Sequence, residues 1–117
     1  MPYFIDKESD WGNIEYKKHF INMTPVKIKK YATQLKFRII EGNGIAIYIV
    51  GVTDIGKILG IEKGEIDYCN HIITQMCQEV DAEIQSKQVI DINSNYKLLI
   101  YVLKNNFSIG DLPYLIG

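Results

Sequence analysis

The sequence contains few residues of the kinds that staple or anchor a chain. It has two cysteines, three prolines and one tryptophan among 117 residues. Cys69 and Cys77 are eight positions apart on one predicted helix, too far along the axis for a disulfide, and no Cys/His cluster surrounds them. No apolar run approaches the ~18 residues that suit a membrane span. No basic segment followed by an apolar one opens the chain, so we expect no secretory signal and no membrane partner. A reducing compartment, cytosol or nucleus, is expected, and we assign the cytoplasm.

Length and composition are those of an ordinary globular domain. Hydrophobic residues make up 47% of the chain and charged residues 23%. A chain of this size buries a core, but not one with room for a large internal active site. We therefore predict one domain over residues 1–117, with an extended arm at 1–12 and a tail at 105–117.

Acidic residues are absent from one long segment. Between Tyr16 and Ile40 there is no Asp or Glu, whereas Glu62 to Asp91 holds seven acids and two lysines. The net charge of −1 hides this asymmetry, which is typical of a module that docks on a polyanion. For any single lysine, a solvated helix surface is the simpler interpretation. The residues predicted to contact RNA phosphates are Lys17, Lys18, Lys27, Lys29, Lys30, Lys36 and Arg38.

Two amphipathic helices are predicted. The first begins at Thr24-Pro25, with Thr as N-cap and Pro at the first helical position, and ends at Glu41-Gly42 with Gly as the left-handed residue. The second runs from Glu62 or Lys63 to Ile84. Their buried rows are Ile28, Ala32, Leu35 and Ile39 in the first, and Ile66, Cys69, Ile73, Met76 and Val80 in the second.

Alternating and continuous apolar runs predict the strands. They cover residues 13–20, 45–50, 58–61, 87–92 and 96–103. The order β-α-β-β-α-β-β predicts an α+β fold, a mainly antiparallel sheet with two helices on one face.

Gly51 to Ile58 almost matches a phosphate-binding loop. Ile58 stands where the loop needs a hydroxyl for Mg²⁺, Asp54 would oppose phosphates, and a strand rather than a helix is predicted to follow. We interpret the stretch as a hairpin turn, and we expect neither a nucleotide nor another cofactor. His19 has no partner at metal-ligand spacing, so we expect no metal there.

Three blocks together resemble a known family. They are Gly12-Asn-Ile-Glu-Tyr-Lys17, Thr33-Gln-Leu-Lys-Phe-Arg-Ile-Ile-Glu-Gly-Asn-Gly-Ile-Ala-Ile-Tyr48 and Gly51-Val-Thr-Asp-Ile-Gly-Lys-Ile-Leu-Gly60. They resemble the N-terminal module of the elongation-factor-like GTP-binding proteins of types one and two, and Met76 to Ile84 resembles a later segment. In that family a GTPase domain follows. Here the sequence stops at Gly117, so the resemblance implies a ribosome- and translation-associated accessory module without GTPase activity.

A small protein of this type standing alone is similar to the microsporidian dormancy factor class, which occupies idle ribosomes. This resemblance implies a non-enzymatic ribosome hibernation factor that binds rRNA and ribosomal proteins and blocks a functional site. One alternative is a protein-binding accessory module of a translational GTPase, acting in trans.

A fainter resemblance is to the Schlafen-type nucleic-acid domain. Asp10, Glu15, Lys17 and Asp54 fall at the places of its acid, Glu-x-Lys and Gly-Val-x-Asp pattern, with Asp10 where that domain has Glu. It implies a second alternative, a metal-dependent endoribonuclease in which Asp10, Glu15 and Asp54 converge on a divalent ion. The simpler interpretation is that Glu15 and Asp54 are solvated strand and turn residues.

Overall fold

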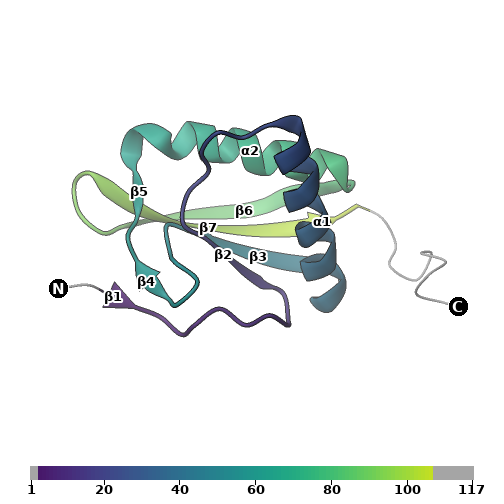
Figure 1. Ribbon diagram of the computed structural model, residues 1–117, viewed down its shortest axis with the longest axis horizontal. Coiled ribbons are helices and arrows are strands. Elements are labelled where there is room, and N and C mark those ends of the chain that lie inside the picture. Colours follow the sequence, from purple (N-terminus) through teal and green to yellow (C-terminus); the bar gives the residue numbers. More distant parts are fainter. Residues whose placement is uncertain (1–2, 107–117) are drawn as a thin grey trace, which may run out of the picture.

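The computed structural model describes residues 3–106, which form ten elements (Figure 1). These are β1 (Tyr3–Phe4), β2 (Ile14–Lys17), α1 (Pro25–Glu41), β3 (Ile45–Val50), β4 (Lys57–Ile58), β5 (Ile61–Glu62), the 3₁₀ turn η1 (Lys63–Glu65), α2 (Ile66–Glu79), β6 (Ala82–Asp91) and β7 (Tyr96–Asn105). The predicted α+β class is confirmed. Neither helix in this range is long and apolar enough to cross a membrane.

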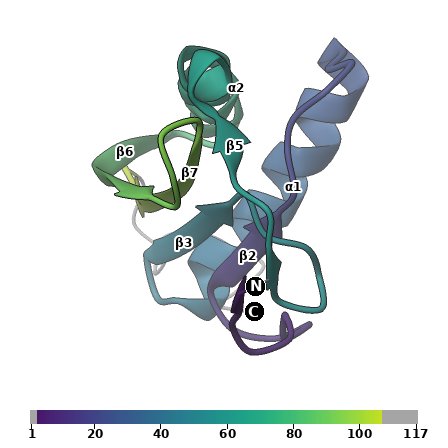
Figure 2. The ribbon, with the colours of Figure 1, turned by 90° about the vertical axis from the view of Figure 1, so that its left-hand side faces the viewer.

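β7 is the middle strand of the main sheet. It pairs antiparallel with β3, β5 and β6, and β3 pairs in parallel with β2. The sheet is therefore mainly antiparallel, as predicted. Both helices cover the same side of it (Figure 2).

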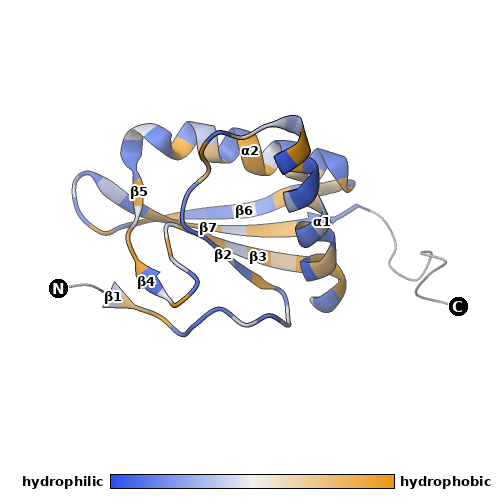
Figure 3. Cartoon of the chain, viewed as in Figure 1, coloured by the Kyte–Doolittle hydropathy of each residue, from blue (hydrophilic) through white to orange (hydrophobic). Residues whose placement is uncertain are grey.

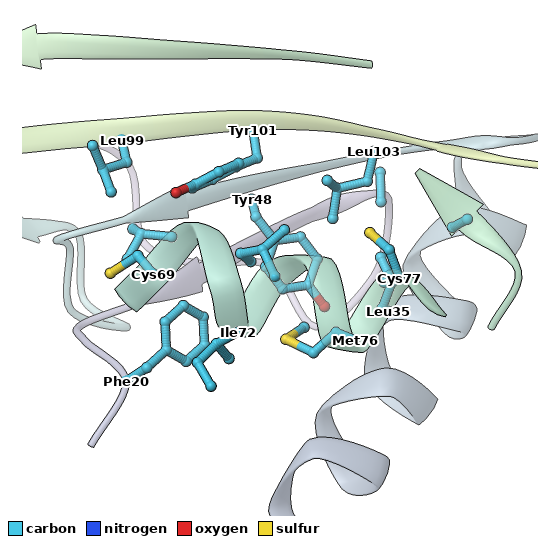
Figure 4. Packing of buried hydrophobic residues seen from close by; sticks show 14 of the residues in the cluster. Phe20, Leu35, Tyr48, Cys69, Ile72, Met76, Cys77, Leu99, Tyr101 and Leu103 are labelled. Carbon is cyan, nitrogen blue, oxygen red and sulfur yellow. The ribbon is translucent and has the colours of Figure 1, made fainter. Parts of the chain in front are cut away.

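Strand alternation decides which side chains meet the helices. Alternate residues of β3 and β7 point into the layer between sheet and helices, where they pack on the buried rows of α1 and α2 (Figure 4). The fully buried members include Tyr48, Val50, Leu99, Tyr101 and Leu103 from the strands, and Leu35, Ile39, Ile73 and Met76 from the helices. Cys69 and Cys77 lie in this core as free thiols. Burial raises their pKa values to about 11 and about 12, which keeps both protonated at neutral pH.

The predicted N-terminal cap of α1 is confirmed, but the prediction that Gly42 is the left-handed residue at its C-terminal end is wrong. The backbone N–H of Lys27 donates to Thr24 Oγ1 at 3.2 Å. Gly42 has φ −93°, and the left-handed residues are Asn43, at φ 53°, and Gly44, at φ 111°. Asn tolerates this conformation better than most side chains, so the reversal begins one residue later than predicted.

α2 is shorter than predicted. It ends at Glu79, and Ala82 to Ile84 begin β6 instead of closing the helix. Val80 and Ile84 have helical spacing, but Asp81 takes φ 56° and reverses the chain. Ile84 then pairs with Leu103 across the sheet. Tertiary pairing outweighs the local helical pattern here.

The predicted strand at 58–61 is divided in two. Leu59 and Gly60 both donate their N–H groups to the Gly51 carbonyl, and Gly60 takes φ 85°. β4 therefore pairs with β1, whereas β5 pairs with β7. The hairpin turn before β4 is confirmed by an antiparallel bridge between Val52 and Ile58.

The described part of the arm lies along this turn. Ile5 N donates to the Gly56 carbonyl and Glu8 N to the Asp54 carbonyl, both at 2.8 Å. The Tyr16 hydroxyl donates to the Asp6 carbonyl at 2.7 Å. The arm thus covers a second small core on the sheet face away from the helices. Of the predicted tail, Asn105 ends β7, and residues 107–117 lie outside the described range.

Gly56 is predicted to be essential for docking the arm. It has φ 91°, and a Cβ there would lie 2.0 Å from the Ile5 carbonyl oxygen. Gly56→Ala should lower the free energy of unfolding by about 1–3 kcal/mol, because it combines left-handed strain with a backbone clash. Urea denaturation measures this. Gly64→Ala, where a Cβ meets nothing within 4 Å, is the matched control and should be nearly neutral. Equal effects of the two changes would contradict the prediction.

Candidate nucleic-acid interface

The seven predicted phosphate-binding residues do not share one surface. Lys18, Lys27, Lys29 and Lys30 are exposed, Lys36 is half-buried with an interaction of its own, and Lys17 and Arg38 turn inward. The exposed lysines of α1 lie in its first two turns. Lys18 lies elsewhere, in a hollow formed with the turn residues Thr53, Asp54, Ile55 and Lys57.

Arg38 was expected on the outer face of α1, and the structure corrects this. Its side chain is 5% exposed and makes its contacts with groups of the protein itself. Nε donates to Glu15 Oε1 at 2.9 Å, while the two terminal nitrogens donate to the carbonyls of Gly12 (2.9 Å) and Ser9 (2.8 Å). Glu8 Oε2 lies 3.6 Å from Nη2. All of its donor groups face protein acceptors, so Arg38 is not offered to a phosphate.

Lys17 is corrected in the same way. Its ammonium donates to Gln34 Oε1 at 3.0 Å, lies 3.6 Å from Glu15 Oε2 and sits 4.1 Å from the centre of the Tyr31 ring. The strand places Lys17 against α1 rather than in water. The basic surface that remains is therefore smaller than the sequence predicted.

The outer face of α1 is continuous and carries no acid before Glu41, the last residue of the helix. Val26, Lys30, Thr33 and Phe37 follow one another at spacings of four, three and four, so they share one side of the helix. That side is opposite the buried row of Leu35 and Ile39. Hydrophilic and hydrophobic residues alternate along α1, as expected for a helix with one buried side (Figure 3). Lys27 and Lys29 flank the row, and no ion pair engages Lys27, Lys29 or Lys30 within residues 3–106.

The three carboxylates of the predicted nuclease site do not form a metal site. Glu15 is held by Arg38 and Lys17, and Asp54 lies in the turn before β4. Across the described residues, no group of three or more His, Cys, Asp or Glu side chains could hold a metal ion. Asp10 instead shares a hollow of about 370 Å³ with Glu8 and Glu15, walled by Phe37 of α1.

Glu8 is the important residue that the sequence did not reveal. Its Oε2 accepts the Tyr16 N–H at 2.6 Å beside Glu15 and Arg38. Burial raises the pKa of Glu8 above 4.5, the charges of Glu15 and Asp54 add to this, and the Tyr16 N–H opposes it. No sequence pattern marks Glu8, because its position depends on how the arm folds back.

Comparison with known proteins gives similarities to a GTP-binding protein and to a viral protein. The chain is 34% identical over 83 residues to GTP-binding protein 2 of Mus musculus and of Homo sapiens, which covers 71% of this chain. It resembles a segment of a GTP-binding protein. It is also 32% identical over 90 residues, or 75% of its length, to an uncharacterized protein of Acanthamoeba polyphaga mimivirus.

The chain matches only part of each of these relatives. The chain spans 14% of the length of GTP-binding protein 2 and 48% of the mimivirus protein. No family model and no solved structure matches the chain. The comparison supports relatedness to a module of a GTP-binding protein.

Stability is predicted to fall as pH rises from 4.5 towards neutrality. A carboxyl whose pKa is raised by folding stabilises the folded state below its unfolded pKa, and this stability is lost as pH rises through the folded pKa. Glu8→Gln should remove this decline, because Gln still accepts the Tyr16 N–H and carries no charge beside Glu15. Urea denaturation at a series of pH values measures it. Asp10→Asn, at an exposed carboxylate on the same arm, should leave the profile unchanged. If Glu8→Gln loses stability with rising pH as the wild type does, the decline is not due to Glu8 and the prediction is wrong.

Proposed function

We propose that this protein is a ribosome-associated module that binds ribosomal RNA through the outer face of α1 and has no catalytic activity of its own. The observation that carries the proposal is the set of exposed lysines Lys27, Lys29 and Lys30. They stand on a helix with no acid before Glu41, and none is engaged in an ion pair within the described residues.

The physical basis is the release of counterions from RNA phosphates. Each phosphate neutralised by a lysine frees condensed cations, so affinity falls steeply as salt rises. Lysine contacts of this kind position a protein on RNA without reading its sequence. The acidic segment from Glu62 to Asp91 would be repelled by the same phosphates, and the charge asymmetry therefore orients the docked module.

The finer proposal is that the module occupies idle ribosomes in the cytoplasm and blocks a functional site, as a hibernation or dormancy factor does. Its support is the resemblance of the sequence blocks to the N-terminal module of the elongation-factor-like GTP-binding proteins. Occlusion needs only a stable docked position.

The second candidate is a protein-binding accessory module that joins a translational GTPase in trans. The similarity to a segment of GTP-binding protein 2 favours it. Such a module would use a face other than the lysines of α1, and the acidic residues of α2 and β6 are the obvious choice. The two candidates therefore predict opposite effects of charge reversal on the two faces.

Charge reversal on α1 should release the protein from ribosomes. Lys27→Glu combined with Lys30→Glu is expected to weaken binding by about tenfold or more near physiological salt, and to reduce the slope of log affinity against log salt by about one per lost phosphate contact. Both positions lie off the buried row of α1, so circular dichroism should show an unchanged fold. Co-sedimentation through a sucrose gradient measures the binding.

The matched control reverses charge on the acidic face. Glu79→Lys combined with Glu83→Lys should leave co-sedimentation unchanged or slightly stronger. If instead the α1 reversals have no effect and the acidic-face reversals abolish binding, the docking face is the opposite one. A protein partner would then replace RNA in the account.

A further inference from the structure

Two aromatic side chains are exposed together at the end of α1. The Trp11 side chain is 73% exposed and that of Phe37 is 40% exposed. Their ring centroids are 6.4 Å apart with an interplanar angle of 54°. Single exposed apolar residues need no explanation, whereas exposed apolar side chains that lie beside one another are a reason to look for a binding site. Trp11 is also the only tryptophan in the chain.

The loop that carries Trp11 is fixed on both sides. The guanidinium of Arg38 donates to the carbonyls of Ser9 and Gly12, which bracket Trp11, and the backbone N–H of Trp11 donates to Ser9 Oγ at 3.2 Å. Gly12, at φ 88°, then turns the chain towards β2. These hydrogen bonds hold the backbone on both sides of Trp11, so little backbone ordering entropy would be lost when a ligand stacks on the exposed indole.

Basic residues continue from this pair along the helix. Lys30 precedes Phe37 by seven residues, two helical turns or about 10 Å along the same side. Lys29 precedes Lys30 by one residue and Lys27 precedes it by three, so all three lysines lie in the first two turns of α1. On the other flank, the hollow beside Phe37 is lined by Glu8, Asp10 and Glu15. A phosphate would be repelled by these carboxylates and attracted towards Lys30. An uncharged base can stack on the aromatic rings that lie between the carboxylates and Lys30.

We propose that Trp11 and Phe37 form a stacking platform for unpaired bases of an RNA whose phosphates bind Lys27, Lys29 and Lys30. The proposal rests on the proposed function and adds the class of RNA, since bases within a duplex are stacked on one another and cannot reach a protein ring. Sequence-tolerant stacking of unpaired bases on aromatic side chains beside a basic surface is a general mode of single-strand binding. The target is therefore a loop, a bulge or a strand end.

The test compares two short RNAs, an unpaired oligo(A) strand and a fully paired duplex of equal length. Tryptophan fluorescence, excited at a wavelength that tyrosine does not absorb, reports on Trp11, and anisotropy of labelled RNA gives the affinity. Oligo(A) should quench the fluorescence at saturation and the duplex should not. Trp11→Ala and Phe37→Ala should each weaken oligo(A) binding by about 5- to 100-fold, the range of base–aromatic stacking, and duplex binding by less than about twofold. Tyr68→Ala, at an exposed aromatic residue of α2 and so outside the outer face of α1, is the control and should change neither.

The outcomes separate this proposal from the proposed function. If both RNAs bind through Lys27 and Lys30 while the Trp11 fluorescence and the Trp11→Ala affinity stay unchanged, the platform is refuted and the phosphate-binding surface stands. If neither RNA binds and ribosome co-sedimentation is also absent, the proposed function fails as well. If Trp11→Ala abolishes co-sedimentation but leaves oligo(A) binding intact, the pair contacts a protein and the platform is overturned.

Discussion

The buried charge of Arg38 is the constraint on which the arrangement of this protein depends. It is the one charged side chain that is buried in residues 3–106. An isolated cation in the interior is costly, and Arg38 is compensated by its ion pair with Glu15 of β2 and by hydrogen bonds to the carbonyls of Ser9 and Gly12, with Glu8 of the arm 3.6 Å from Nη2. A helix, a strand and the arm are thereby fixed to one another. The gain is in geometry more than in stability, since ion pairs of this kind often add little net stability.

This network also divides the basic residues into two groups with different roles. Arg38 and Lys17 stand among acceptors of their own chain, whereas Lys27, Lys29 and Lys30 face outward without such partners in the described part of the chain. The same guanidinium that holds the arm also holds the loop of Trp11. α1 thus contributes to three features: Arg38 to the internal ion pair, Phe37 to the exposed aromatic pair, and its lysines to the basic face.

The sequence predicts the elements whose local pattern agrees with their tertiary setting. α1 has a capping threonine, a proline at its start and a clear apolar row, and β3 is an uninterrupted apolar run between glycines; both lie where predicted. The end of α2 and the division at Gly60 were missed because left-handed Asp81 and strand pairing outweighed helical and extended patterns. Glu8 and the burial of Arg38 could not be predicted, since a long-range ion pair leaves no spacing in the sequence. The sequence alone does not distinguish which of the seven basic residues are exposed and which turn inward.

The central proposal is that the lysine face of α1 contacts the ribosome, and it rests on the exposed Lys27, Lys29 and Lys30. Lysine modification followed by mass spectrometry, with and without saturating ribosomes, tests it most directly. The account predicts that Lys27, Lys29 and Lys30 lose their reactivity on binding, while the exposed Lys63 and Lys87 of the acidic segment keep theirs. Protection of Lys63 and Lys87 with continued labelling of Lys27, Lys29 and Lys30 would contradict it.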